Sequence, residues 1–249
     1  MVEIITVTAD TVEKYGFFCK MSARKSVAWQ AKRDWLLQRF DEGLQLRLLG
    51  DGERGFIEFM PGAKSWRAID DAKDFIVIHC LWVVGKSRGQ GYATALIGEA
   101  ETWAKENGYR GVAALTGNGN WLISPGVLEH HGYRAVDRAE HGFELLAKCF
   151  RGGGFPRLSG GWHAKAQALG PGLTVLRTAQ CPYLEDAASH ARRAAEKLSI
   201  PFHDEVLTSA EDLRARSPSP YGTYALVFDG KLLSYHYLLE KQILAKLAA

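Results

Sequence analysis

A short cationic turn rich in glycine is the stretch of this sequence best suited to bind an anion. Residues 83–93, VVGKSRGQGYA, hold three glycines together with Lys86 and Arg88. An apolar run precedes the turn and a helical pattern follows it, so we expect the turn to connect a strand to the start of a helix. Main-chain N–H groups at a helix start favour negative charge, and glycine lets a phosphate come close to them. These residues therefore predict a phosphate- or pyrophosphate-binding turn.

Two common nucleotide-binding motifs do not fit this turn. Its sequence GKSRGQG is not the GxGxxG of a dinucleotide-binding fold, and no acidic residue closes a second strand about twenty positions later. The turn also lacks the GxxxxGK followed by Ser or Thr of a P-loop. A turn with a purely structural role stays an alternative at this point, because glycine-rich turns are common.

The elements that must position the turn are visible on both sides of it. Residues 74–84 are almost wholly apolar and rich in β-branched side chains, which predicts a strand buried on both faces at the centre of a sheet. Apolar residues then recur at helical spacing from Tyr92 to Trp103, the pattern ends at Asn107-Gly108, and GVAAL follows as a short strand. Further upstream, residues 22–43 predict a helix, and Asp51-Gly52 predicts the turn of a β-hairpin.

The composition favours two domains and argues against several classes of partner. The chain has 249 residues, 47% of them hydrophobic, and a formal net charge of +3. At roughly 150 residues per domain we expect a domain at 1–150, a glycine-rich linker at 151–172 and a smaller domain at 173–249. The small net charge argues against a nucleic acid partner. No apolar run approaches the ~20 residues of a membrane span and no signal-peptide pattern is visible, so we expect no membrane partner and a cytoplasmic location.

Metal and disulfide chemistry are not expected. The cysteines are widely separated and include no CxxC pair, so we expect four thiols rather than a zinc ribbon or a disulfide framework. His130 and His131 are adjacent, and on a helix their side chains diverge by ~100°, which prevents both from binding one metal ion. We therefore predict no metal site.

The turn and its flanks resemble the acyl-CoA-binding core of the GNAT superfamily of N-acetyltransferases. The superfamily signature is [QR]xxGx[GA]. The stretch from Lys86 to Gly91 is similar to it, except that Lys86 stands where the signature has Gln or Arg. Downstream, GNGNWLISPGVLEHHGYRAVDR resembles the last helix of the superfamily and its Gly132-Tyr133 turn. The likeness covers about residues 40–150. Four further stretches are FFCKMSARKS, WLLQRFDEGL, GFIEFMPGAKSWRAI and IHCLWVVGK. Together they resemble the group of acetyltransferases that carry a C-terminal YoaP-like domain.

This resemblance implies a mixed α/β sheet fold and acetyl-CoA as co-substrate. The pantetheine would pair with main-chain groups where strands four and five of the sheet splay apart, and the pyrophosphate would lie on the N–H groups of residues 88–93. The acceptor would be a small-molecule or peptidyl amine. The residues implied in acetyl-CoA binding are Trp82, Val83, Val84, Lys86, Arg88, Gly89, Gln90, Gly91, Tyr92, Ala93 and Asn120.

The catalytic groups implied by the resemblance are only partly present. Where many relatives carry a Tyr that protonates the CoA sulfur, this sequence has Leu128. Ser124, His130, His131 or a water could replace that acid, or the thiolate could leave unprotonated. On the fourth strand, where some relatives place a carboxylate base, the sequence offers His79 and Cys80. His79 is the better base, since an unperturbed imidazole titrates near pH 6.5, although a hydrogen-bonded core residue is an equal alternative.

Candidates for acceptor binding follow the predicted hairpin. In this architecture the third strand and its following loop face the acceptor, which makes Glu58, Trp66 and Arg67 candidates. A carboxylate and an aromatic ring suit a cationic acceptor. A packed Trp66 and a solvated Glu58 are the alternative.

The second half resembles a thioredoxin-like domain. Its predicted order βαβαββα is that of thioredoxin-like folds, and Cys181-Pro182-Tyr183 in the first turn of its first helix resembles the start of a glutaredoxin active site. Pro218 or Pro220 stands where such folds place a cis-proline. The fourth position of the motif is Leu184, so no resolving thiol exists for a dithiol cycle. This domain is expected to position the acceptor, with Cys181 among the residues that bind it, or simply to pack on the first domain. In the alternative function, Cys181 works as a single thiol in an acyl-CoA-binding or redox module.

Overall fold

The computed structural model describes residues 2–119 and 121–248, and these residues form two compact units that are each described separately. Unit 1 consists of the described residues of Met1–Met21, Leu36–Ser65 and Ile69–Leu158, and unit 2 consists of those of Ser22–Trp35, Trp66–Ala68 and Ser159–Ala249. Two short segments of the first half of the chain thus belong to unit 2. The domain boundaries predicted at residues 150 and 173 stay a proposal.

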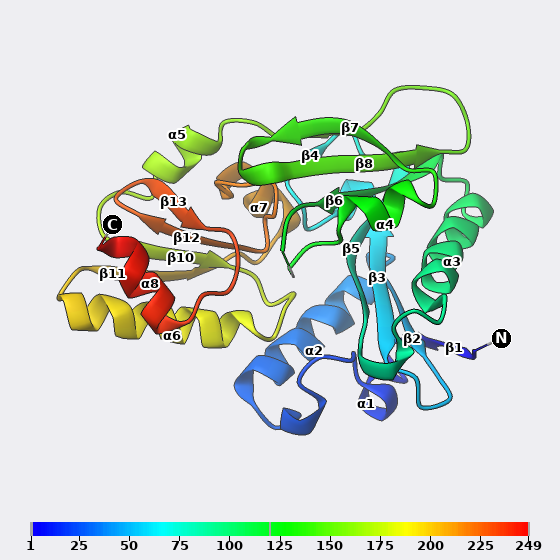
Figure 1. The fold of residues 1–249 in the computed structure, drawn as a ribbon, viewed down its shortest axis with the longest axis horizontal. Helices are drawn as coiled ribbons and strands as arrows, with labels where there is room; N and C mark the ends of the chain where they lie inside the picture. Colours follow the sequence, from blue (N-terminus) through cyan, green and yellow to red (C-terminus); the bar gives the residue numbers. More distant parts are fainter. Residues whose placement is uncertain (1, 120, 249) are drawn as a thin grey trace. The chain divides into compact units, whose positions relative to one another are not determined.

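A seven-stranded sheet forms the frame of unit 1 (Figure 1). Its strands lie in the order β1-β2-β3-β5-β6-β8-β7, with β5 and β6 parallel and the other neighbours antiparallel. The strands are β1 Ile4–Val7, β2 Gln45–Leu49, β3 Gly55–Pro61, β5 Phe75–Val83, β6 Gly111–Thr116, β7 Arg134–Ala139 and β8 Phe143–Cys149. The mixed α/β class and the central position of the strand predicted at residues 74–84 are both confirmed.

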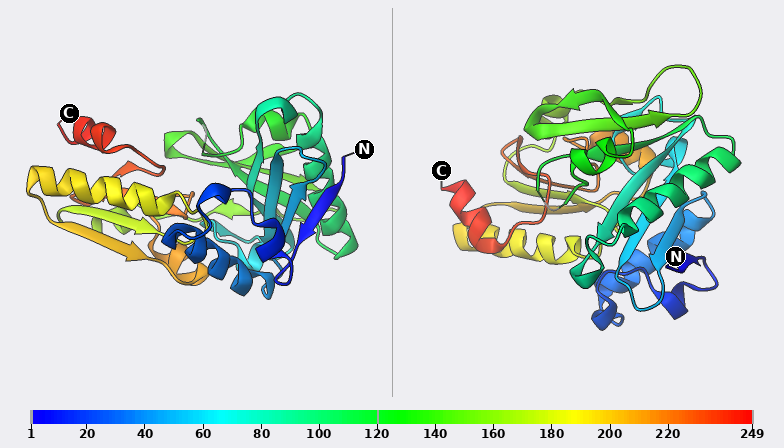
Figure 2. Two further views of the ribbon diagram at one scale, coloured as in Figure 1. Left: turned by 90° about the horizontal axis from the view of Figure 1, so that it is seen from below. Right: turned by 45° about the vertical axis from the view of Figure 1, so that its right-hand side comes forward.

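Helix α3, Tyr92–Glu106, lies along one face of this sheet and contacts β3, β5 and β6, as the right view of Figure 2 shows. It buries Leu96, Ile97, Ala100 and Ala104. Leu96 and Ala100 belong to the predicted stripe, whereas its outer members, Tyr92 and Trp103, are half-buried. Each fully buried Leu or Ile contributes roughly 1.5–3 kcal/mol, so this stripe fixes the helix on the sheet. The other α-helices that contribute to unit 1 are α1 Val12–Tyr15, α4 Pro125–Glu129 and α2 Val27–Phe40, the last of which contributes residues to both units.

The predicted β2–β3 hairpin is present and turns at the expected dipeptide. Asp51 and Gly52 have φ angles of 53° and 75°, in the left-handed region that this dipeptide tolerates. The predicted glycine-rich linker contains structure of its own, because the segment holds β9 Arg157–Leu158, which pairs with β4 Ile69–Asp70, and helix α5 Trp162–Gln167.

Unit 2 contains a four-stranded sheet in the order β11-β10-β12-β13, in which β10 and β11 are parallel. The elements from residue 173 onward are β10 Leu173–Arg177, α6 Leu184–Leu198, β11 Phe202–Val206, α7 Ala210–Arg216, β12 Tyr224–Phe228, β13 Lys231–Ser234 and α8 Glu240–Leu247. This is the predicted order βαβαββα. In the left view of Figure 2, α6 is the long yellow helix beside this sheet. The thioredoxin-like assignment itself stays a prediction.

Two details of the second half differ from the sequence-based expectation. Helix α6 begins at Leu184, so Cys181, Pro182 and Tyr183 form the turn before the helix instead of its first turn. No cis peptide bond occurs among the described residues, so the expected cis-proline at Pro218 or Pro220 is wrong. Across residues 2–119 and 121–248, none of the helices combines the length and the apolar character that crossing a membrane would require.

Candidate functional site

The glycine-rich turn between β5 and α3 has open space beside the main chain of its glycines. Gly85, Gly89 and Gly91 have φ angles of 62°, 75° and 79°, a region that other L-residues adopt at a cost. A Cβ atom built on any of the three would find no heavy atom within 4 Å beyond its chain neighbours. Space for a ligand therefore adjoins the main chain where the sequence predicts a phosphate.

The N–H groups of this turn are available to a ligand. Among the described residues, those from Gly89 to Thr94 donate no hydrogen bond, and the first that does is that of Ala95, to the Gly91 carbonyl at 3.1 Å. Lys86 and Arg88 are exposed beside them. Several N–H groups that point out of a helix start, with two cations close in sequence, provide the chemistry of an anion site. The turn thus fits the pyrophosphate of acetyl-CoA.

Ser87 fixes the turn to the neighbouring hairpin and was missed by the sequence reasoning. It is fully buried, its hydroxyl donates to Glu53 Oε2 at 2.5 Å, and it accepts from the N–H of Arg54 at 2.8 Å. The Val84 N–H also donates to the Arg54 carbonyl, at 3.0 Å. Ser87 occupies a variable position of the signature, so no sequence signal identified it.

Strands β5 and β6 separate beside this turn. Their parallel pairing ends at Ile78 and Ala114, although β5 continues to Val83 and β6 to Thr116. Alternate residues of a strand direct their main-chain groups to opposite sides. Because the Val84 N–H already faces Arg54, the main-chain groups of Val83 face the side of β6. Among the main-chain contacts predicted for the pantetheine, this geometry favours Val83. The preceding residue, Trp82, is 39% exposed.

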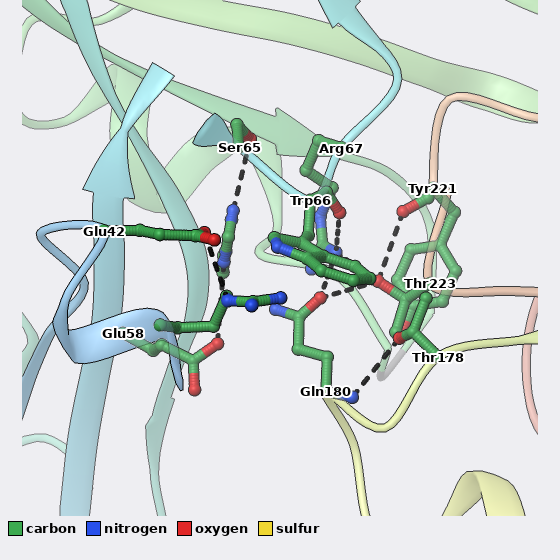
Figure 3. Close-up of polar contacts among 11 residues, drawn as sticks. Glu42, Glu58, Ser65, Trp66, Arg67, Thr178, Gln180, Tyr221 and Thr223 are labelled. Atoms are coloured by element: carbon green, nitrogen blue, oxygen red, sulfur yellow. Dashed lines mark hydrogen bonds and ion pairs between the residues drawn. The ribbon is translucent and has the colours of Figure 1, made fainter. Parts of the chain in front are cut away.

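His79 lies in a β-bulge where the two strands begin to separate. Glu58 pairs with Cys80 and Phe59 pairs with Ile78, so His79 is the extra residue of β5. Its Nε2 lies 3.1 Å from Ser65 Oγ, and its Nδ1 lies 3.6 Å from Glu58 Oε1. Figure 3 shows Ser65 and Glu58 from this group.

Burial changes what these side chains can do. The His79 side chain has no exposed surface, and Glu58 and Ser65 are also buried. Direct contact between His79 and a bound amine is therefore not available in this structure. Glu58, which we expected to bind the acceptor, instead lies against His79. Cys80 is half-buried.

The start of helix α4 offers a hydroxyl, whereas its middle does not. Ser124 is the N-cap residue of α4, is exposed, and makes no side-chain capping bond. Leu128 is fully buried in the core that α3 and the sheet share. The position where many relatives carry a tyrosine therefore offers no proton donor here. Asn120, expected to bind acetyl-CoA, lies outside the described residues.

Trp66 and Arg67 serve the interior of unit 2 instead of an acceptor site. Trp66 is 1% exposed, and its ring meets that of Trp35 edge-on at 5.4 Å. Arg67 is 3% exposed and donates to Gln180 Oε1 at 3.0 Å and to the Thr223 hydroxyl (Figure 3). These contacts hold both side chains in the interior of unit 2, a packing that does not favour the predicted role of Trp66 and Arg67 in acceptor binding, which stays a prediction.

Cys181 lies in the turn between β10 and α6 and is half-buried. Its neighbour Gln180 is buried, accepts from Arg67 and Thr223, and donates its N–H to Thr178 Oγ1 at 3.2 Å. Leu184, at the position of a resolving cysteine, is buried. The turn is thus firmly held and carries a single thiol.

Comparisons with known proteins point to one family. The model of the acetyltransferase (GNAT) family matches residues 16–122. Over 239 residues, 94% of each chain, the protein is 29% identical to the uncharacterized N-acetyltransferase YoaP of Bacillus subtilis.

Solved structures of acetyltransferases are also similar to this chain. The ribosomal-protein-alanine N-acetyltransferase of Brucella melitensis is 14% identical with a TM-score of 0.44, over 59% of this chain and 99% of that one. An N-acetyltransferase of Staphylococcus aureus Mu50 is 12% identical with a TM-score of 0.45, over 61% of this chain and 99% of that one. From the family match, residues 16–122 carry an acetyltransferase domain of the GNAT family, and the protein is an acetyltransferase with acetyl-CoA as its co-substrate.

Proposed function

We propose that this protein transfers the acetyl group of acetyl-CoA to an amine nitrogen by direct attack on the thioester. The observation that carries the proposal is the open turn before α3, whose N–H groups from Gly89 to Thr94 have no acceptor among the described residues. The turn lies at the end of β5, next to the point where β5 and β6 separate. The name of the Bacillus subtilis relative supports nitrogen as the acceptor atom.

In this proposal the turn and the β5 edge bind the co-substrate. The N–H groups of Gly89, Gln90, Gly91, Tyr92 and Ala93 hold the pyrophosphate, and Lys86 and Arg88 add positive charge. Main-chain groups of Val83 pair with the pantetheine, with Trp82 and Val84 beside them. Main-chain donors and acceptors suit this task because they are fixed before the ligand arrives.

In the reaction one bond forms, one bond breaks and two protons are transferred. The amine lone pair attacks the thioester carbon, a C–N bond forms, and the C–S bond breaks to release the thiolate of CoA. The nitrogen must lose a proton. We assign its final uptake to His79 through the Ser65 hydroxyl at 3.1 Å, a relay that requires acceptor binding to open the buried Ser65. Glu58, 3.6 Å from the other ring nitrogen, favours the imidazolium that results.

The leaving thiolate needs a proton or a polar environment. Ser124 is our candidate donor, because it is exposed at the start of α4 and its hydroxyl makes no cap bond. Cys80 and Trp82 are partly exposed residues of β5 beyond the bulge, and we propose them as neighbours of the acceptor amine. A small-molecule amine and a peptidyl amine both fit these features.

The test combines binding with kinetics. Calorimetry should detect acetyl-CoA binding, and release of CoA across a panel of small and peptidyl amines should show turnover. In His79→Gln, kcat should fall about 100-fold and the acidic limb of the kcat/KM profile should disappear, since general base catalysis contributes about that much. A full-rate His79→Gln with an unchanged pH profile would reduce His79 to a packing residue.

The alternative function, a redox or acyl-CoA-binding module that works through Cys181, has weaker support. Glu185 and Asp186 occupy the first turn of α6. Glu185 is paired with Arg177 at 2.8 Å, and the charge of Asp186 opposes a thiolate at Cys181. Cys181→Ser should therefore leave acetyl transfer unchanged within about twofold. Acetyl-CoA binding without turnover on any amine, together with thiol exchange that Cys181→Ser removes, would favour the alternative. We also propose, with either function, that residues 173–249 form a YoaP-like, thioredoxin-like domain.

A further inference from the structure

A histidine that the proposed mechanism does not use lies against the first turn of α3. Nε2 of His131 is 3.3 Å from Oγ1 of Thr94, and Thr94 is the third residue of the helix. The N–H of Thr94 belongs to the run from Gly89 that has no acceptor among the described residues. The imidazole thus contacts the residue that directly follows Ala93, the last residue whose N–H we assign to the pyrophosphate.

The charged groups around His131 come from three elements. His130 is its chain neighbour, with the two rings 5.6 Å apart, and Glu101 of α3 and Lys148 of β8 also act on it. Lys148 Nζ binds both carboxylate oxygens of Glu101, at 2.9 and 2.7 Å. Burial, together with Glu101, raises the pKa of the adjacent Tyr133 well above its usual range, which keeps that phenol neutral. Glu101 is thus already neutralised by a lysine.

These surroundings disfavour a charged imidazole when no anion is present. Burial is the largest cause that lowers the pKa of His131, the charge of His130 and that of Lys148 also lower it, and Glu101 opposes them. The half-buried ring is therefore mostly neutral at neutral pH. A phosphate beside it would reverse the balance, because an opposite charge close by favours the protonated form.

We propose that His131 binds a phosphate group of acetyl-CoA as an imidazolium, so that binding of the co-substrate takes up a proton at this residue. The inference rests on the proposed function of the turn before α3. It adds to that turn a side chain that titrates near physiological pH. His131 is a ligand-binding residue in this proposal and takes no part in the chemical step.

The sign of the pH dependence follows from linkage. The pKa of His131 is higher in the complex than in the unliganded protein, so protonation and binding strengthen each other. The contribution of His131 to affinity is complete below its lowered pKa in the unliganded protein. It is lost as the pH rises through its higher pKa in the complex. Acetyl-CoA affinity should therefore decline with increasing pH across this window.

Calorimetry in buffers of different ionisation enthalpy measures the proton uptake directly. The full-length protein would be titrated with acetyl-CoA between about pH 5.5 and 8, together with His131→Gln and the matched control His130→Gln. A terminal phosphate of the ligand also titrates near pH 6, and the comparison of variants removes that contribution. S-acetylpantetheine, which lacks the pyrophosphate, serves as the second ligand and as a check that each variant is folded.

We expect His131→Gln to weaken acetyl-CoA binding about fivefold near pH 6 and less than about twofold near pH 8. The uptake assigned to His131 should disappear in this variant and persist in His130→Gln, and S-acetylpantetheine should bind both variants like the wild type. The inference would be overturned, and the proposed function would stand, if His131→Gln took up as many protons as the wild type. The same would follow if this variant lost as much affinity for S-acetylpantetheine as for acetyl-CoA. No acetyl-CoA binding by the wild-type protein would overturn the proposed function and this inference together.

Discussion

The two units each contain a strand, a turn and a helix in sequence, yet the two turns differ in what they leave open. In unit 1 the turn connects β5 to α3 and contains Gly85, Gly89 and Gly91, all with positive φ and with open space beside them. In unit 2 the turn connects β10 to α6 and carries Thr178, Gln180 and Cys181. Apart from the buried Ser87, residues 85–91 of the first turn are exposed, whereas Thr178 and Gln180 of the second turn are buried.

This difference indicates that the start of a helix becomes an anion site only when its N–H groups remain available to a ligand. In the second turn the Gln180 N–H donates to Thr178 Oγ1 and the Leu184 N–H donates to the Cys181 carbonyl at 3.1 Å. Two carboxylates, Glu185 and Asp186, occupy the first turn of α6. Both carboxylates lie at the positive end of the helix, where they compete with a phosphate, although Glu185 is also paired with Arg177 at 2.8 Å. No acidic residue occupies the first turn of α3.

The largest effect should come from placing a negative charge in the first turn. We expect Gly89→Glu to weaken acetyl-CoA binding at least about 100-fold, because like charges about 4 Å apart repel by about 4 kcal/mol at an effective dielectric of about 20, before screening. Gly89→Lys is the matched control, since it imposes the same positive-φ strain with the opposite charge. Calorimetry with acetyl-CoA checks both variants. Equal losses in the two would show that backbone strain, and not charge, decides binding.

The second turn should respond in stability instead of ligand binding. Arg67 is buried against Gln180, Thr223 and the ring of Tyr221, so Arg67→Met should lower the free energy of unfolding by about 2–3 kcal/mol. Acetyl-CoA affinity should stay within about twofold. Urea denaturation followed by tryptophan fluorescence measures the first quantity and calorimetry the second. The exposed Lys231→Met, on β13 of the same unit, is the control and should change the free energy by less than about 0.5 kcal/mol.

The fold of both units was largely predictable because its signals are local. The β-branched run at 74–84, the helical stripe from Tyr92 to Trp103 and the dipeptide Asp51-Gly52 each specify their element through nearby residues. The assignment of the short segment Trp66–Ala68 to unit 2 was not predictable, because it depends on contacts with residues more than a hundred positions away. The same long-range contacts place Arg67 in the interior, which its position after the hairpin did not indicate.

The site was predictable only where main-chain geometry is encoded by glycine. The positive φ angles at Gly89 and Gly91 follow from the residue type, so the turn could be located from the sequence. The bulge at His79 could not, because it arises from how β5 pairs with β3. Nor could the contact between His131 and Thr94, which joins residues 37 positions apart.

The smallest effect tests how the first turn is kept open. Ser87 is buried, donates to Glu53 and accepts from the Arg54 N–H, so it joins the turn to the β2–β3 hairpin. Ser87→Ala removes the hydroxyl and should destabilise the ordered conformation of the turn by about 1 kcal/mol. We therefore expect acetyl-CoA affinity to fall about fivefold. Calorimetry measures the change. Glu53→Gln, which retains an acceptor for the Ser87 hydroxyl, should lose less than about twofold. If Ser87→Ala bound acetyl-CoA as tightly as the wild type, the glycines would suffice to keep the first turn open, and the contrast with the second turn would rest on its buried side chains and carboxylates.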